Sequence, residues 1–127
     1  VDKGLEALEE VRHYIEKKRP DVFFPFEARK TAGDTAWLSP FNGGSRISIA
    51  VHCYHKDAFD FLFTDVEPIF QKYGGRPHWG KLNSMTAAQA QEWYPDFDKF
   101  ATLRQELDPG GRFLNGYLSD LFKQDLS

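Results

Sequence analysis

The chain has 127 residues, 41% of them hydrophobic and 28% charged, a balance typical of one folded globular domain. Its formal net charge of −3 gives no electrostatic reason to expect a nucleic-acid partner. No apolar run reaches the roughly 20 residues that a membrane-spanning helix needs. Aromatic residues make up 16% of the chain, and this much aromatic surface must be buried in a core, against another domain or around a ligand.

The ends and the cysteine content bear on the context of the chain. It begins at Val1 and its only methionine is Met85, so we expect it to be part of a longer protein. Cys53 is the only cysteine, which excludes an internal disulfide and disfavours a thiolate metal cluster. We expect a cytoplasmic protein, and a membrane association of the full-length protein is left open.

The first third of the chain predicts a helix and then a strand. Four apolar residues at helical spacing predict an amphipathic helix of about four turns that ends before Pro20. These residues are Leu5, Leu8, Val11 and Ile15. The aromatic segment 22–29 predicts a strand, in which Pro25 marks an edge or a bulge.

A loop, a second strand and a second helix are expected next. Residues 32–46 are rich in turn-forming residues. Residues 46–54 predict a strand with Ile47, Ile49, Val51 and Cys53 on one side and Ser48, Ala50, His52 and Tyr54 on the other. An aromatic stripe over 59–73 predicts a helix with Asp57 as its N-cap, Pro68 as a kink or division, and Gly74-Gly75 as its end.

Short helices are expected in the last third. The sequence from Thr86 to Gln89 fits a capping box that opens one helix, and Tyr94-Pro95 ends it. A further helix is expected to carry Phe97, Phe100, Leu103 and Leu107, followed by a turn at 108–111 and a closing segment, 113–122. The pattern predicts an α+β fold, with a small antiparallel sheet, helices on one side of it and a short helical C-terminal segment.

Glu27 and Arg29 are the first candidate functional residues. On a strand, positions i and i+2 share a face, so a carboxylate and a guanidinium lie side by side. They offer a hydrogen-bond acceptor and a donor fork, which suits a polyhydroxylated ligand. The alternative is a modest ion pair on a solvated strand face. The neighbouring phenylalanines favour function, because they predict a pair that is shielded from solvent.

The segment 76–81, with sequence RPHWGK, is the second candidate. It could place Lys81 beside an anion or a developing negative charge. Equally, it could be a surface turn that Trp79 anchors. A metal site at His52 and His55 is disfavoured, because residues three apart on a strand point to opposite faces. We predict no metal, and Cys53 is expected to be a small core residue rather than a nucleophile.

Four motifs in order resemble the D-arabinono-1,4-lactone oxidase family, which includes L-gulono- and L-galactono-lactone oxidoreductases and alditol oxidases. The segment 76–81 is similar to its HWGK segment, Phe26-Glu27-Ala28-Arg29 to its E-x-R strand and Trp37-Leu38-Ser39-Pro40 to its W-L-S-P loop. Downstream, Tyr94-Pro95, Leu107-Asp108-Pro109 and Phe113-Leu114-Asn115 are similar to its closing pattern. The resemblance extends from about residue 5 to 122.

The resemblance implies an FAD-dependent enzyme that oxidises a hydroxyl of a sugar-1,4-lactone by hydride transfer to the flavin. It implies that an N-terminal domain outside this chain binds most of the FAD and is the partner of this part. Residues of about 1–75 would form a cap part, and about 76–127 a flavin-proximal helical part. We expect the chain alone to be inactive.

The resemblance also implies roles for individual residues. Glu27 and Arg29 would bind or polarise the hydroxyl that is oxidised, and Lys81 would stabilise the reduced, anionic flavin. His52 and Tyr54 would line the substrate pocket, and His78 and Asn115 would face the cofactor. Tyr54 departs from a substrate-contacting threonine of an alditol oxidase relative, which favours a lactone over a linear alditol. The alternatives are an alditol oxidase, or a non-catalytic module that binds a carbohydrate or a protein.

Overall fold

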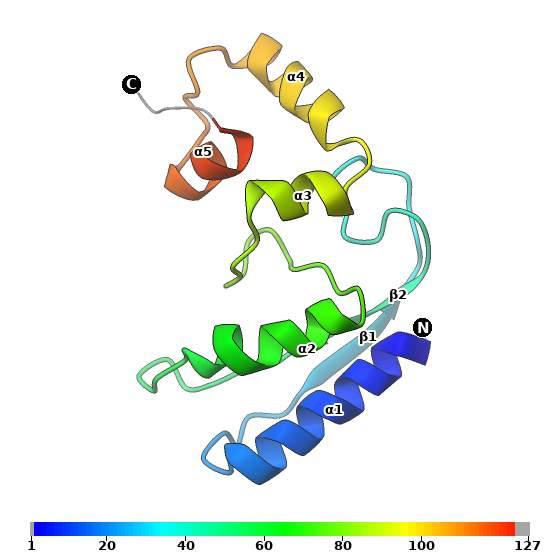
Figure 1. Cartoon of the computed structure of the whole chain (residues 1–127), viewed down its shortest axis with the longest axis vertical. Coiled ribbons are helices and arrows are strands. Elements are labelled where there is room, and N and C mark those ends of the chain that lie inside the picture. Colours follow the sequence, from blue (N-terminus) through cyan, green and yellow to red (C-terminus); the bar gives the residue numbers. More distant parts are fainter. Residues whose placement is uncertain (1, 124–127) are drawn as a thin grey trace.

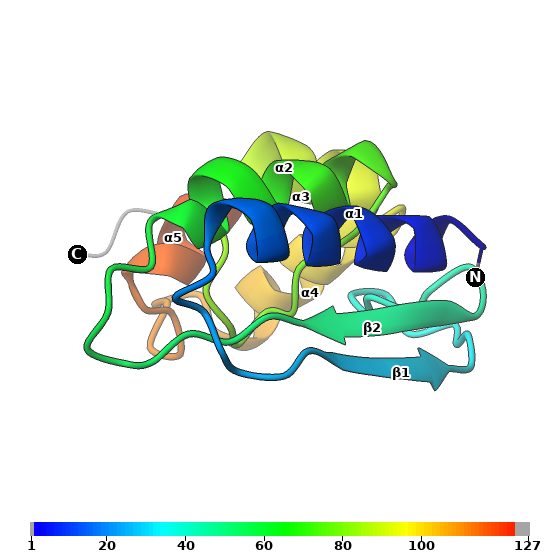
Figure 2. The ribbon, with the colours of Figure 1, turned by 90° about the horizontal axis from the view of Figure 1, so that it is seen from below.

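A computed structural model describes residues 2–123, in which five α-helices, one π-helical segment and two strands are found (Figure 1). In chain order these are α1 (Asp2–Lys18), β1 (Glu27–Thr31), β2 (Arg46–Ala50), η1 (Leu62–Val66), α2 (Glu67–Lys72), α3 (Ala87–Trp93), α4 (Phe97–Leu107) and α5 (Gly116–Phe122). The strands form an antiparallel two-stranded sheet, and α1 and α2 lie on one side of it (Figure 2). The predicted α+β fold, with its short helical C-terminal segment, is confirmed.

The pairing of the two strands sorts their side chains into two faces. Glu27 lies opposite Ala50, and Arg29 lies opposite Ser48. Ile47 belongs to the other face of the ribbon, which packs against α1. It lies so close to Gly4 of α1 that a Cβ atom added to Gly4 would be 3.0 Å from the Cβ of Ile47. We call the opposite face the polar face; its members are Glu27, Arg29, Thr31, Arg46, Ser48 and Ala50.

Both strands are shorter than the sequence predicted. The strand expected over 22–29 begins only at Glu27, and the strand expected over 46–54 ends at Ala50. These two residues are paired with each other, so the ladder stops for both strands at the same place. Residues 22–26 have no strand beside them to pair with among the described residues, and Pro25 cannot donate a ladder hydrogen bond.

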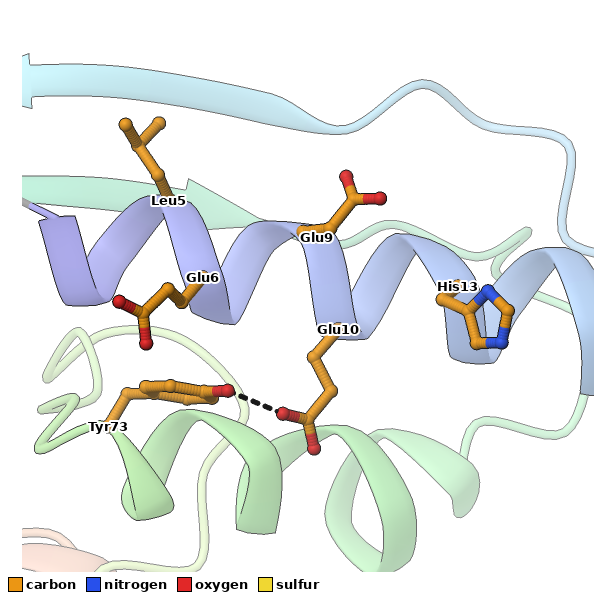
Figure 3. A pocket seen from close by; sticks show the side chains of 6 residues that line it. All are labelled: Leu5, Glu6, Glu9, Glu10, His13 and Tyr73. Carbon is orange, nitrogen blue, oxygen red and sulfur yellow. Dashed lines mark hydrogen bonds between the residues drawn. The ribbon is translucent and has the colours of Figure 1, made fainter.

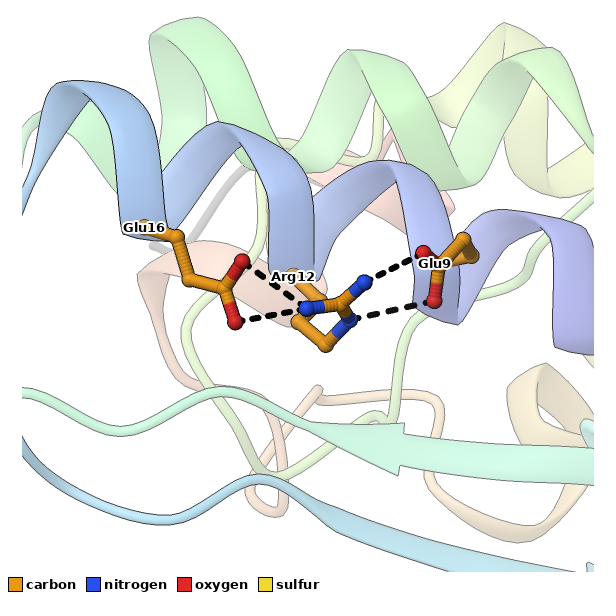
Figure 4. A network of polar contacts seen from close by, with 3 residues as sticks. All are labelled: Glu9, Arg12 and Glu16. Carbon is orange, nitrogen blue, oxygen red and sulfur yellow. Dashed lines mark hydrogen bonds and ion pairs between the residues drawn. The ribbon is translucent and has the colours of Figure 1, made fainter.

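Helix α1 is amphipathic as predicted and ends before Pro20, but its buried stripe is displaced from the expected one. Ala7, Val11 and Ile15 are buried, whereas Leu5 is 54% exposed. The solvent side carries a network in which Arg12 donates hydrogen bonds to Glu9 and Glu16 (Figure 4). Such exposed pairs at spacings of three and four each stabilise a helix by about 0.3–0.5 kcal/mol.

The second predicted helix has two segments, and it starts later than expected. Asp57 is not its N-cap, because the backbone N–H of Asp57 donates to the carbonyl of Tyr54 in a separate turn and the helical segment begins at about Phe61. The π-helical segment η1 gives way to α2, whose first turn holds Pro68. Proline has no N–H to donate to the preceding turn, and the change from η1 to α2 falls just before Pro68. The helical backbone continues through this point, so the two segments differ in their hydrogen-bonding pattern and are not separate helices. Gly74, with a φ of +74°, ends α2 as predicted.

The helix ends in the last third follow the local signals. The capping box of α3 is formed, since the N–H of Gln89 donates to Thr86 Oγ1 and the N–H of Thr86 donates to Gln89 Oε1. Helix α4 begins after Pro95 as predicted, although Leu103 and Leu107, expected on its apolar stripe, are exposed. The closing segment forms helix α5.

Two apolar clusters hold the chain together. One joins α1 to η1 and is centred on four buried residues: Val11, Ile15, Phe61 and Val66. The other joins α3, α4 and α5 and contains five: Met85, Ala90, Tyr94, Phe97 and Leu121. The clusters fall on either side of residue 75, and the division into a cap part and a flavin-proximal part stays a prediction.

We expect Ile15→Ala to lower the free energy of unfolding by about 2–4 kcal/mol, because Ile15 is only 5% exposed and its loss leaves a cavity in the first cluster. Leu5→Ala, in the same helix and on the same predicted stripe, should change it by no more than about 0.5 kcal/mol. Chemical denaturation of both variants measures the difference. Equal losses would contradict the burial pattern of α1.

Candidate functional site

The polar face brings together the first pair of candidate residues. The guanidinium of Arg29 forms an ion pair with the carboxylate of Glu27, two residues away on β1. Ser48 lies opposite Arg29 on β2, so a small hydroxyl rather than a bulky side chain stands beside the pair. An acceptor, a donor fork and open space on one rigid ribbon can hold a ligand that carries several hydroxyl groups.

The pair is open to solvent in the described part of the chain, contrary to the expectation that phenylalanines shield it. The side chain of Arg29 is 72% exposed and that of Glu27 is 44% exposed. Phe23 and Phe24 precede β1 and stack on each other, with ring centroids 4.9 Å apart, instead of flanking the pair. An exposed pair of this kind contributes only about 0–1 kcal/mol to stability, so folding does not require it.

His52 and Tyr54 follow the end of β2. The predicted alternation continues past the strand, because Val51 and Cys53 pack against the first apolar cluster whereas His52 and Tyr54 are exposed. Cys53 is thus a partly buried core residue, as expected. The ring of Tyr54 lies 4.5 Å from that of His55, so Tyr54 is oriented by its neighbour rather than by Glu27 or Arg29.

The segment 76–81 is a turn that Trp79 anchors. The indole Nε1 of Trp79 donates to the carbonyl oxygen of Leu38 at 2.8 Å, and its ring packs on Tyr94 at 5.2 Å. His78 Nδ1 accepts from the backbone N–H of Gly80 at 3.0 Å. Lys81 is exposed, and its side chain makes no hydrogen bond or ion pair with a described residue. Its ammonium group is therefore presented on a defined turn and is free to meet an anion.

The loop between the strands, residues 32–45, receives this turn. The loop folds on itself, because Ser39 Oγ donates to Asp34 Oδ2 at 2.6 Å and the N–H of Asp34 donates to the carbonyl of Phe41. Gly33 lies against the backbone of Gly44, where an added Cβ would be 2.5 Å from the carbonyl carbon of Gly44. The loop thus presents the carbonyl of Leu38 to Trp79 from a fixed backbone.

Arg76, the first residue of the segment 76–81, lies beside Tyr94. Arg76 Nη1 donates to the carbonyl of Asn42 at 3.3 Å, and its guanidinium lies 5.1 Å from the centroid of the Tyr94 ring. Burial and the nearby positive charge of Arg46 lower the pKa of Arg76. Arg46 belongs to the polar face, and its Nε is buried without a hydrogen-bond partner among the described residues. Arg76 and Tyr94 are far apart in the sequence, so no local pattern predicts their contact.

Asn115, predicted to face the cofactor, caps helix α5. Its Oδ1 accepts from the N–H of Leu118 at 2.9 Å, which gives it a structural role at the helix start. In residues 2–123 no group of three or more His, Cys, Asp or Glu side chains could hold a metal ion. None of the helices described is long and apolar enough to cross a membrane.

A groove with several glutamate side chains lies between α1 and α2 (Figure 3). It is lined by Leu5, Glu6, Glu9, Glu10, His13 and Tyr73. Glu10 accepts hydrogen bonds from Tyr73 Oη at 2.6 Å and from Lys72 Nζ at 2.7 Å, and these bonds lower the pKa of its carboxyl group. The polar groups at its centre are used in holding the two helices together, so we assign no ligand to this groove.

Comparison with known proteins gives the chemical class. The chain is 42% identical over 116 residues to the L-gulono-1,4-lactone dehydrogenase of Mycobacterium tuberculosis, covering 91% of this chain and 27% of that protein. It is 37% identical to the L-gulonolactone oxidase of Mus musculus (95% and 29%) and 36% identical to the alditol oxidase of a Streptomyces species (93% and 28%). These relatives are oxidoreductases.

Residues 1–121 match the family described as D-arabinono-1,4-lactone oxidase, and the chain belongs to this family. The chain spans less than a third of the length of these relatives. The family is FAD-linked in general. Among the described residues Lys81 offers an exposed cation, but the groove between α1 and α2 has no cationic group free to hold a dinucleotide, and the helix-capping groups of α3 and α5 are already occupied.

We expect Tyr94→Phe to keep or raise the free energy of unfolding near pH 7, by up to about 1 kcal/mol. The phenol of Tyr94 is fully buried and has no hydrogen-bond partner among residues 2–123, because the nearby indole of Trp79 donates to Leu38 instead. Burial also raises the pKa of Tyr94, so the folded protein prefers the neutral phenol. The free energy of unfolding therefore falls as the pH rises above about 10, where the unfolded protein ionises the phenol more readily than the folded protein.

The variant should therefore lose less stability than the wild type between about pH 9 and pH 11. Denaturant unfolding across this range measures both effects. Tyr117, whose pKa burial also raises, leaves some alkaline destabilisation in the variant. A loss of several kcal/mol at pH 7 would mean that the hydroxyl of Tyr94 has a partner.

Proposed function

We propose that this chain is the substrate-binding part of an FAD-dependent oxidoreductase that oxidises a hydroxyl group of a sugar-1,4-lactone, of the D-arabinono-, L-gulono- or L-galactono-lactone type. The observation that carries the proposal is the Glu27–Arg29 pair, which stands on one face of the ribbon with Ser48 opposite and without a structural task. Membership of the family supplies the reaction class.

The chemistry of the pair suits the first requirement of the reaction, which is to hold one hydroxyl in a fixed direction. The carboxylate of Glu27 accepts a hydrogen bond from the substrate hydroxyl. Arg29 donates a hydrogen bond to a neighbouring oxygen of the substrate. The ion pair with Arg29 also holds the carboxylate of Glu27 in a fixed direction on the ribbon. His52 and Tyr54, at the end of the same ribbon, extend the surface along the sugar.

The cofactor side of the reaction falls to the turn at 76–81 and to the part of the protein outside this chain. When bound, FAD accepts the hydride from the carbon that carries the hydroxyl. Lys81 supplies a positive charge on the side of the flavin ring, and its turn is held by Trp79 rather than by the cofactor. His78 and Asn115 complete this side as weaker candidates, since each already makes a local hydrogen bond.

An alditol oxidase is the second candidate, because a relative of that name shares 36% identity over 93% of the chain. Tyr54 favours the lactone. Its ring adds apolar surface beside a pocket wall, which suits the closed ring of a lactone better than an extended chain of hydroxyl groups. Parallel assays with a sugar lactone and with a linear alditol decide between the two.

We expect Glu27→Ala and Arg29→Ala in the full-length protein each to lower kcat/KM for the lactone at least about a hundredfold, because each removes a group that orients the reacting hydroxyl. The flavin content, read from the visible absorbance, should remain close to that of the wild type. Steady-state kinetics with a sugar-1,4-lactone measures the effect.

Lys30→Ala is the matched control. Lys30 directly follows Arg29 on β1 but belongs to the opposite face of the ribbon, and it is exposed. Its replacement should leave kcat/KM within about twofold of the wild type. Wild-type kinetics in the Glu27 and Arg29 variants would refute the role assigned to the pair.

We also expect the 127 residues alone to be colourless and inactive. Only the turn that carries Lys81, together with Asn115, faces the flavin in this proposal, which is too little surface to retain a dinucleotide. Gel filtration after incubation with FAD measures retention, and circular dichroism shows that the piece is folded. A yellow, active preparation of the folded 127 residues would contradict this expectation.

A further inference from the structure

Helix α4 has an apolar stripe that is covered at its start and open at its end. Phe97 is buried in the cluster that joins α3, α4 and α5, and Phe100 stacks on Phe122 with ring centroids 5.8 Å apart. Leu103 and Leu107 continue the stripe at spacings of three and four residues, yet they are 41% and 77% exposed. The described residues therefore cover only the first half of this stripe.

The turn after α4 holds a phenylalanine out into solvent. The carboxylate of Asp108 accepts the backbone N–H of Arg112 at 2.9 Å and that of Phe113 at 3.0 Å. The N–H of Gly111 donates to the carbonyl of Asp108 at 3.1 Å, and Arg104 of α4 donates to the same carbonyl. Phe113 is nevertheless 86% exposed. A firmly held backbone thus presents a large apolar side chain to its surroundings.

The exposed end of the stripe and this phenylalanine lie close together in the fold. Leu103 and Leu107 are one helical turn apart, and Asp108, next to Leu107, holds the N–H of Phe113. Phe97 is the only buried residue of α4 in the described structure, and a helix of 11 residues is marginal in water without packing. Because the backbone is already fixed, covering these side chains costs little ordering entropy.

We propose that Leu103, Leu107 and Phe113 form a docking surface for an apolar face of the same polypeptide outside these 127 residues. The chain spans 27–29% of the length of its relatives, so more than two thirds of a protein of that length lies outside it. The inference rests on this length and on the exposed side chains, and it does not depend on the substrate.

The small size of the surface favours a partner within the same polypeptide. A stable complex between separate chains buries about 800 Å² on each partner. Three side chains, none of them fully exposed, supply roughly half of that area. A segment of the same polypeptide is held at a high effective concentration, so a smaller contact is enough. The exposed charges beside the surface, Glu106 and Arg112, have opposite signs, which does not favour an anionic membrane.

Hydroxyl-radical footprinting of the unaltered full-length protein reads the exposure of Phe113 directly. Phe97, buried at the start of α4, is the protected reference. If the surface is docked, Phe113 is oxidised at least about tenfold more slowly than in the unfolded protein, at a rate that approaches that of Phe97. Oxidation of Phe113 at nearly its unfolded rate, while Phe97 stays protected, overturns the proposal.

Cysteine labelling of the full-length protein is an independent measurement. Leu107→Cys and the control Thr102→Cys are reacted with a maleimide dye, and the unaltered protein gives the background from native cysteines such as Cys53. Thr102 is exposed and lies about 140° around α4 from Leu107. Docking predicts that the Leu107 variant reacts at least about tenfold more slowly than the control. Equal rates in the two variants overturn the proposal.

Dilution and added vesicles identify what covers the surface. Protection that does not change with protein concentration supports a partner within the same polypeptide. Protection that is lost on dilution assigns the surface to a second copy, and protection that appears only with phosphatidylcholine–phosphatidylserine vesicles assigns it to a membrane. Either result overturns the intramolecular docking. Lactone oxidation by the unaltered protein is assayed separately, and its absence would count against the proposed function while the docking result stands.

Discussion

The one-sided packing of the ribbon is the constraint on which the rest of the structure depends. A two-stranded antiparallel pair is at best marginally stable in water, so it must bury one face. Ile47 meets helix α1 at Gly4, and Val51 and Cys53 continue this apolar side into the cluster around Val11. The alternation of a strand then directs Glu27, Arg29 and Ser48 to the other face. The face that carries the proposed substrate contacts is free because the other one is used for folding.

Hydrogen bonds to two backbone carbonyls and one carboxylate join the residues before 75 to those after it. Trp79 donates to the carbonyl of Leu38, Arg76 donates to that of Asn42, and Ser84 donates to the carboxylate of Glu67. The strand loop thus positions the turn that carries Lys81, although the loop itself has no part in the proposed reaction. In the leading hypothesis, substrate contacts come from the ribbon and cofactor contacts from this turn. The hydrogen bonds between the two halves then determine how the substrate and the cofactor are placed relative to each other.

Local signals in the sequence predicted the helices well and the site only in part. The capping box at Thr86, the break at Tyr94-Pro95 and the glycine end of α2 act within a few residues, and all three are confirmed. The strand ends and the exposure of Leu5 depend on which segments lie opposite, which local patterns do not contain. The sequence predicted that Glu27 and Arg29 lie side by side, because positions i and i+2 of a strand share a face. The contact of Arg76 with Tyr94 was not predicted, because only the fold brings these two residues together.

Gly33 gives the loop an unusual kind of fragility. Its α-carbon faces the backbone of Gly44 so closely that even a methyl group would overlap it. Any other residue there must push the two arms of the loop apart and displace the carbonyl of Leu38 from Trp79. A survey of substitutions that reads activity alone will therefore rank Gly33 with the catalytic residues, although it has no side chain to act with. At this position, sensitivity to mutation reports the shape of the backbone and not the chemistry of the reaction.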